Sequence, residues 1–227
     1  MRCIGHRGCP AHAPENTLLA VERAAPHVDA IEVDVRRCGS GELVVFHDER
    51  LGRLTGAEGR VDRTDWSTLR TLTVGGSDER IPLLSELLDA VPPSVGVNVE
   101  LKHAGMGREA VRLLEGVENE VIVSSFEPAA LREVGARSDL PRGYLFSREL
   151  TTKRRSWRRG IRRARRLGCE CAHPEYRLCL DGGRRVGRAR DLGLAVNAWT
   201  VPNRRAVREL RRAGVDGVIV DDWRVVG

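Results

Sequence analysis

Three carboxylates lie in two segments whose alternation of apolar and polar residues is typical of β-strands. Glu32 and Asp34 occur in A-I-E-V-D-V, and Glu100 occurs in V-G-V-N-V-E-L-K. Successive side chains of a strand point to opposite faces, so Glu32 and Asp34 share one face. The opposite face is aliphatic in both segments, and an unpaired charge beside such an interior is costly. We therefore expect a cation to meet these carboxylates. Three carboxylate oxygens without a thiolate suit a hard divalent ion such as Mg²⁺ or Ca²⁺, with Mn²⁺ as an alternative.

Other polar side chains follow the ends of further predicted strands. His6 and Arg7 end the first strand, His47 and Asp48 end the added strand in L-V-V-F-H-D, Lys102 closes E-L-K, and Trp199 lies in V-N-A-W-T-V. Each of them alone is more typical of a structural role than of a catalytic one. Their convergence from unrelated strands favours a site, because packing gives no reason for it. Two histidines can divide proton removal and proton donation. The two cations can hold a phosphate, so the set predicts metal-assisted cleavage of a phosphoester.

Strand-like and helix-like segments alternate from end to end of the 227 residues, which predicts a parallel sheet with helical cover. The predicted strands are 2–6, 30–35, 43–47, 96–101, 120–125, 142–146, 169–173, 194–200 and 216–221. The predicted helices are 17–25, 83–91, 107–116, 128–137, 153–167, 184–192 and 203–213. The number of units favours a TIM (β/α)₈ barrel, although a doubly wound sheet has the same local signature.

One part of this pattern departs from simple alternation. The segment 43–47 follows Asp34 too closely for a helical crossover, so residues 30–47 are interpreted as a hairpin-like addition. Residues 49–80 show little periodicity and are predicted to form a small insertion after the added strand. No second domain boundary is visible, so residues 1–227 are predicted to form a single barrel domain.

Composition narrows the class of protein. The formal net charge is +6, and of 38 Lys and Arg residues only two are lysines, so Lys102 persists where Arg is the default. Six cysteines show no zinc-binding spacing and are expected to be reduced and mostly buried. No signal peptide precedes the first predicted strand, and no apolar run is long enough to span a membrane. We therefore expect a soluble, cytoplasmic protein.

An ordered series of short motifs resembles the glycerophosphodiester phosphodiesterase family. H-R-G, P-E-N-T, E-x-D, V-V-F-H-D, E-L-K, S-S-F, W-T-V and D-G-V-I-V-D-D occur in the family's order from residue 4 to residue 222. The resemblance implies a TIM barrel with a small insertion, mapping to about 49–80. It also implies cleavage of glycerophosphodiesters to glycerol phosphate and an alcohol, an activity of lipid and glycerol metabolism.

The resemblance also implies roles for individual residues. Metal ligands map to Glu32, Asp34 and Glu100, and an acid–base pair maps to His6 and His47. Phosphate-contacting positions map to Arg7 and Lys102, and an aromatic residue at the glycerol pocket maps to Trp199. The family commonly has Asn directly after W-T-V, whereas here Pro202 precedes Asn203.

Five further residues also receive predictions. Asn16 or Thr17 is expected to cap the helix near Leu18, with Asn16 favoured. Glu15 is a candidate partner of Arg7, and Asp48 is a candidate for orienting His47. His173 is a candidate pocket residue.

The segment 153–167 carries nine basic residues between Lys153 and Arg166. An apolar stripe at helical spacing predicts an outer barrel helix that packs on it and exposes its arginines. The alternative is a surface for peripheral contact with an anionic membrane. The latter would suit lysophospholipase D-type hydrolysis of membrane lysophospholipids rather than of small-molecule glycerophosphodiesters. A different class is a catalytically silent barrel that binds anions or membranes. No motif predicts specific nucleic-acid binding.

Overall fold

Strands and helices alternate along the chain in the computed structural model, which describes residues 1–148 and 152–227. The strands are β1 (Arg2–His6), β2 (Ala30–Arg37), β3 (Leu43–Val45), β4 (Gly96–Leu101), β5 (Val121–Ser125), β6 (Arg142–Phe146), β7 (Cys171–Pro174), β8 (Ala195–Ala198) and β9 (Gly217–Val220). The α-helices are α1 (Leu18–Ala24), α2 (Gly52–Thr55), α3 (Trp66–Leu69), α4 (Leu84–Ala90), α5 (Gly107–Leu114), α6 (Pro128–Gly135), α7 (Lys153–Arg166), α8 (Arg184–Arg190) and α9 (Arg204–Ala213). Short 3₁₀ turns lie at η1 (Ala25–His27), η2 (Val61–Arg63), η3 (Tyr176–Leu178) and η4 (Trp223–Val225).

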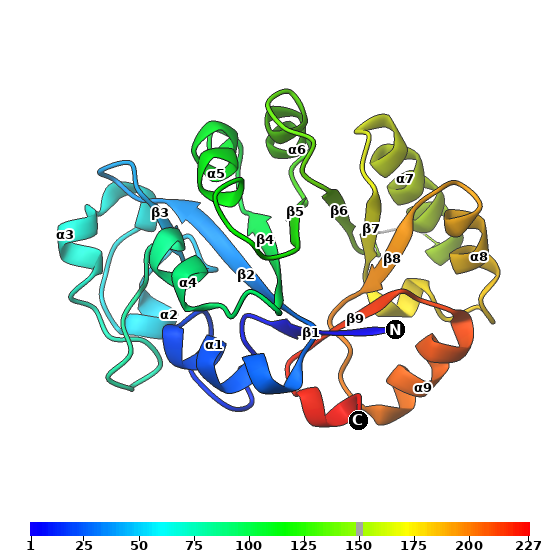
Figure 1. Cartoon of the computed structure of the whole chain (residues 1–227), viewed down its shortest axis with the longest axis horizontal. Coiled ribbons are helices and arrows are strands. Elements are labelled where there is room, and N and C mark those ends of the chain that lie inside the picture. Colours follow the sequence, from blue (N-terminus) through cyan, green and yellow to red (C-terminus); the bar gives the residue numbers. More distant parts are fainter. Residues whose placement is uncertain (149–151) are drawn as a thin grey trace.

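The strands close into a ring. The parallel order is β1-β2-β4-β5-β6-β7-β8-β9, and β9 returns to pair with β1. Helices surround these strands, as Figure 1 shows. This is the TIM barrel fold, so the predicted barrel is confirmed and the doubly wound alternative is wrong. The remaining strand, β3, lies outside the ring and pairs antiparallel with β2, as expected for the hairpin-like addition.

The aliphatic faces of the strands build the layer between barrel and helices. Ile31, Val33 and Val35 of β2 join Val97 and its neighbours on β4 in one buried cluster with residues of α4 and α5. A second buried cluster joins β6–β9 with α7, α8 and α9. Both clusters are apolar, so the opposite faces of the same strands are left to carry the polar groups of the barrel interior.

The segment between β3 and α4 holds α2, η2 and α3 and packs around a small apolar cluster of its own. Leu51, Val61, Leu69 and Ile81 are buried there against Phe46. Figure 1 shows this cyan segment beside β3, at one end of the molecule. It therefore lies next to the end of β2 that carries Asp34.

Two further expectations concern cysteine and the membrane. All six cysteines are free and buried, as expected. Within the described ranges, none of the helices has both the length and the apolar composition needed to cross a membrane.

Candidate functional site

The three predicted carboxylates meet inside the barrel near the carboxyl ends of the strands. β2 and β4 pair in a register that sets Asp34 beside Glu100 and Glu32 beside Asn98. One oxygen from each of Glu32, Asp34 and Glu100 lies within 4.8 Å of the others. All three residues are buried. Alternation within β2 and the register between the two strands therefore suffice to assemble the cluster.

Two cations lie against this cluster. Lys102 Nζ donates to Glu100 Oε1 at 2.6 Å and lies 2.8 Å from Asp34 Oδ1. Arg7 Nε lies 3.0 Å from Asp34 Oδ2. Burial alone would raise the pKa of Asp34, but Lys102 and Arg7 hold it well below its usual range. Glu32 has weaker cationic support, and burial together with the charge of Asp34 raises its pKa to about 8.

The donor set fits a hard divalent cation. All three groups supply carboxylate oxygens, the ligands that Mg²⁺ and Ca²⁺ prefer. Asp34 Oδ1 is buried and lies 2.8 Å from Lys102 Nζ. A carboxylate has several lone pairs, so this ion pair leaves room for a cation as well. The residues present therefore suit a single divalent ion.

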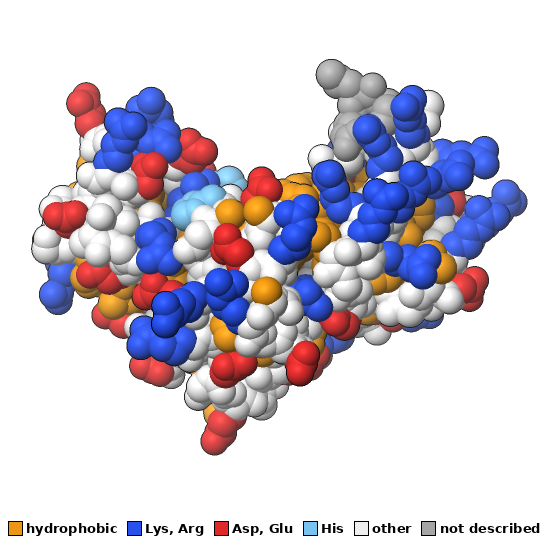
Figure 2. Space-filling view, turned by 90° about the horizontal axis from the view of Figure 1, so that it is seen from above, with side chains coloured by type: hydrophobic (Ala, Val, Ile, Leu, Met, Phe, Trp, Pro, Cys, Tyr) orange, Lys and Arg blue, Asp and Glu red, His pale blue; other side chains and the backbone are white. Residues whose placement is uncertain are grey.

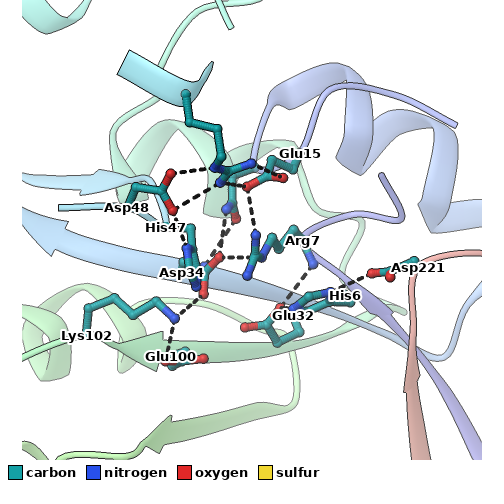
Figure 3. Close-up of polar contacts among 12 residues, drawn as sticks. His6, Arg7, Glu15, Glu32, Asp34, His47, Asp48, Glu100, Lys102 and Asp221 are labelled. Carbon is teal, nitrogen blue, oxygen red and sulfur yellow. Dashed lines mark hydrogen bonds and ion pairs between the residues drawn. The ribbon is translucent and has the colours of Figure 1, made fainter. Parts of the chain in front are cut away.

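The two predicted histidines flank the cluster, and each is oriented by its own carboxylate (Figure 3). His6 Nδ1 lies 2.6 Å from Asp221 Oδ1, and His47 Nδ1 lies 2.6 Å from Asp48 Oδ1. A carboxylate only accepts hydrogen bonds, so Nδ1 carries the proton in both pairs and Nε2 is left for other partners. His6 Nε2 faces Glu32 Oε2 at 4.0 Å.

The environments of the two histidines shift their pKa values in opposite directions. Burial would lower the pKa of His6, but Asp221 and the charge of Glu32 raise it overall. Burial lowers the pKa of His47, and the charge of Asp34 only partly opposes that effect. The two rings are therefore not equivalent proton carriers.

Arg7 is fixed by the backbone as well as by its side chain. Its φ is +49°, and its N–H donates to Glu32 Oε2 at 3.0 Å. Its Nη1 donates to Glu15 Oε1 at 2.8 Å, which confirms the predicted partner. The next residue is Gly8 with a φ of +74°, and a Cβ there would lie 2.6 Å from Ala20 Cβ. The H-R-G turn thus needs glycine to bring α1 close behind the site.

Arg53 joins two of these groups, and no motif or periodicity in the sequence indicates that it does. It comes from α2, in the segment without periodicity. Its Nη2 donates to Glu15 Oε1 at 2.7 Å and to Asp48 Oδ1 at 3.1 Å. One guanidinium therefore links Glu15, the partner of Arg7, to Asp48, the partner of His47; both carboxylates are labelled in Figure 3.

The prediction that Asn16 caps α1 is wrong. Thr17 is the N-cap: its backbone is extended and its side chain accepts from Ala20 N. Asn16 has a φ of +61°, so it cannot take the extended cap conformation. Instead its Nδ2 donates to Asp34 Oδ2 at 2.8 Å, and its Oδ1 accepts from Asp34 N at 3.2 Å. Asn16 therefore helps to position a residue of the carboxylate cluster.

Four other residues lie on or beyond the strands β7, β8 and β9. Trp199 is partly buried, donates from Nε1 to His173 O at 2.7 Å, and meets the ring of Phe126 edge-on at 5.3 Å. His173, the candidate pocket residue, has a fully buried side chain that contacts Asn197 and lines a small cavity inside the barrel. Asp221 was missed as the partner of His6, although the closing D-G-V-I-V-D-D placed a carboxylate at a strand end. Asn203 caps α9 by accepting from Ala206 N, so the departure after W-T-V serves that helix.

Comparisons with known proteins agree in family and fold. The model of the "Glycerophosphoryl diester phosphodiesterase family" matches residues 6–225. A glycerophosphodiester phosphodiesterase of Caldanaerobacter subterraneus subsp. tengcongensis is 31% identical, over 96% of this chain and 93% of that protein. The probable glycerophosphodiester phosphodiesterase 2 of Mycobacterium tuberculosis is 32% identical, over 96% of this chain and 86% of that protein. An Oleispira antarctica phosphodiesterase, solved with the product sn-glycerol-3-phosphate, aligns with a TM-score of 0.87 and 28% identity. That alignment covers 100% of this chain and 95% of the other.

Proposed function

The chain belongs to the glycerophosphoryl diester phosphodiesterase family, and from this premise we propose that it is a metal-dependent hydrolase of glycerophosphodiesters. The products are glycerol phosphate and an alcohol. The observation that carries the proposal is the buried cluster of Glu32, Asp34 and Glu100 with a carboxylate-oriented histidine on either side. A barrel that only bound anions would have no use for buried carboxylates, so the silent alternative is not favoured.

In this proposal Glu32, Asp34 and Glu100 hold one divalent cation, Mg²⁺ or Ca²⁺, with Mn²⁺ as the alternative. When bound, the ion supplies Lewis-acid stabilisation of the charge that develops on the phosphoryl oxygens. Asn16 and Lys102 keep Asp34 in place by hydrogen bonding and charge. Removal of any one of the three carboxylates should therefore weaken metal binding and activity together.

The remaining groups bind the phosphodiester and move protons. Arg7 and Lys102 provide positive charge at the edge of the cluster, and Arg7 is held against Glu15 so that its guanidinium stays fixed. His6 and His47 present Nε2 for proton transfer, because Asp221 and Asp48 occupy Nδ1. Trp199 borders the part of the site that receives glycerol. Its indole is fixed by the hydrogen bond to His173 O.

Two broader assignments belong to the same proposal. Residues 49–80 form the insertion of a single-domain barrel; their separate apolar cluster and the contribution of Arg53 to the site support this. A cytoplasmic location is supported by the free, buried cysteines, because reduced thiols are usual in that compartment.

The test is hydrolysis by metal-stripped protein to which Mg²⁺, Ca²⁺ or Mn²⁺ is returned. Glycerophosphocholine, glycerophosphoglycerol and a lysophospholipid form the substrate panel. We expect metal-dependent release of glycerol phosphate from the first two, whereas preference for the lysolipid would favour the lysophospholipase D alternative. No hydrolysis with any of the three ions would overturn the proposal.

Calorimetry on Glu32→Gln, Asp34→Asn and Glu100→Gln tests the ligand set directly. Glu58→Gln is the matched control, since Glu58 is exposed. The three cluster variants should lose metal affinity and the control should keep it. Unchanged affinity in the cluster variants would reject these ligands.

A further inference from the structure

An arginine-rich groove of about 980 Å³ lies on the outside of the barrel, between α7 and the segment that contains α8. Eight arginines line it: Arg154, Arg158, Arg162, Arg165, Arg166, Arg184, Arg185 and Arg188. Figure 2 shows blue side chains gathered on the right-hand arm of the molecule, with hydrophobic side chains between them. The lining of the groove shares no residue with the candidate site, so the groove is a separate feature.

The charge of the groove is not neutralised by its own lining. Among the residues that the structure describes, Asp181 is the one acidic lining residue, and it pairs with Arg185 at 3.3 Å. Arg158, Arg162 and Arg188 are exposed and form no ion pair with a carboxylate of the described residues. Elsewhere many arginines are paired, for example Arg190 with Asp216. So many like charges around one hollow repel each other, and an anion would relieve that repulsion.

The groove also has an apolar floor. Trp157 and Ile161 of α7, together with Ala189 and Leu192, contribute to its lining. The first three are buried, which confirms that the apolar stripe of α7 packs on the barrel, whereas Leu192 is 43% exposed. A ligand that fits must therefore combine negative charge for the arginines with apolar surface for the floor.

We propose that this groove binds anionic phospholipids and docks the protein on an acidic membrane surface. Lipid phosphates would meet the arginines, and the adjoining part of the acyl chains would cover Leu192 and the floor. The guanidinium fork suits a phosphate, and basic residues near an acidic surface attract it strongly. This inference goes beyond the proposed activity and does not depend on it.

The groove lies near the side of the barrel that carries the candidate site. α7 begins at Lys153, soon after β6 ends at Phe146. The amino end of α7 therefore lies on the side of the barrel where the strands end, and that is the side of the candidate site. A membrane held at the groove would lie next to the rim of the barrel.

Nucleic acid is a poorer fit to the same charge. Proteins that bind single strands offer exposed aromatic rings on which bases stack. The aromatic lining residue, Trp157, is only 5% exposed and packs edge-on against Phe146 at 5.9 Å. The floor thus offers apolar contact without a stacking platform.

Co-sedimentation with vesicles tests the docking. The protein, without substrate, is mixed with vesicles of phosphatidylcholine alone or with an equal part of phosphatidylglycerol. We expect binding only to the anionic vesicles, and weaker binding at high salt because the interaction is screened. Equal binding to both vesicle types, or to neither, would overturn the proposal.

A charge-reversed pair locates the surface. Arg158→Glu with Arg162→Glu should weaken vesicle binding by at least about 30-fold, from a factor of about five per basic residue near the membrane. The charge-matched control is Arg208→Glu with Arg212→Glu on α9, which makes the same charge change at the same spacing on exposed residues. This control should bind anionic vesicles like the wild type. Equal loss in both pairs would mean that net charge alone drives binding and would refute a specific groove.

Leu192→Ser tests the apolar floor and separates lipid from nucleic acid. The variant should bind anionic vesicles several-fold more weakly, because exposed apolar surface is removed from the groove. Unchanged binding would contradict the proposed lipid occupant. A single-stranded oligonucleotide that displaces the vesicles at equal phosphate concentration would likewise overturn it in favour of nucleic acid. Thermal unfolding of each variant verifies that it is folded.

Discussion

Replacing Lys102 by Met should reveal how much the carboxylate cluster depends on its ammonium group. Met keeps most of the side-chain volume and removes the charge. Lys102 Nζ lies 2.8 Å from Asp34 Oδ1 and 2.6 Å from Glu100 Oε1. At an effective dielectric constant of about 20, each pair attracts by about 6 kcal/mol. Burial of the ammonium opposes much of this attraction, so the net loss should be about 3–5 kcal/mol, as for other broken buried pairs.

Metal should change the size of that loss. Without the ammonium, the cluster retains uncompensated negative charge, and a divalent cation can neutralise it. Lys102→Met should therefore bind Mg²⁺ more tightly than the wild type, and Mg²⁺ should restore part of the lost stability. Turnover should still fall, because the phosphate loses a cationic partner.

The assay is urea unfolding in chelator and in Mg²⁺, with calorimetry for metal affinity and steady-state kinetics for turnover. Lys153→Met is the matched control, since it removes the other lysine of the chain at the start of α7. The control should change stability by no more than about 0.5 kcal/mol. Weaker metal binding by Lys102→Met, or an equal stability loss with and without Mg²⁺, would refute the reasoning. If the variant does not fold in chelator, its recovery of structure on titration with Mg²⁺ still reports the predicted sign.

Three further predictions concern single contacts. Asp221→Asn should slow turnover by about 10- to 100-fold with metal affinity unchanged, because it loosens His6; kinetics and calorimetry measure this, and an unchanged rate would contradict it. Gly160→Ala should lower the free energy of unfolding by about 1–2 kcal/mol, because the added Cβ would clash with the ring of Phe146. This overpacking outweighs the gain in helix propensity. A variant that is more stable than the wild type in urea unfolding would contradict this prediction. Burial lowers the pKa of His173 to about 4. The unfolded chain therefore binds a proton at a higher pH than the folded protein does. The free energy of unfolding should consequently fall by about 1.4 kcal/mol per pH unit as the pH drops from about 6.5 towards 4. His173→Gln should remove that part of the pH dependence, and identical slopes for the two proteins in urea titrations would reject it.

The predictable parts of the site are those in which the position of a side chain follows from its near neighbours in the sequence. Alternation places Glu32 and Asp34 on one face, and parallel strands bring their carboxyl ends to one rim, where Glu100 also lies. Adjacent residues are similarly accessible to prediction: Asp48 follows His47 directly. The core was predictable for the same reason, since the aliphatic faces of the strands have a fixed period.

The contacts that could not be predicted depend on conformation or on long-range closure. Asn16 and Thr17 are both good cap residues by type, and only the left-handed backbone of Asn16 decides between them. Arg53 lies in a segment whose sequence has no period, so nothing in the pattern directs its side chain toward Glu15. His173 ends the predicted strand 169–173, but the structure continues the strand to Pro174 and turns the His173 ring into the barrel interior.

Closure of the ring also determines which residues can act together. β1 pairs with β2 on one side and with β9 on the other, so its carboxyl end meets both. There the backbone N–H of Arg7 binds Glu32, whereas the ring of His6 binds Asp221, 215 residues further along the chain. The first strand thus links the carboxylate cluster to the last strand of the barrel. A proton carrier placed at this junction is positioned only when the ring is closed, so catalytic competence should require the complete barrel even though the three carboxylates come from β2 and β4 alone.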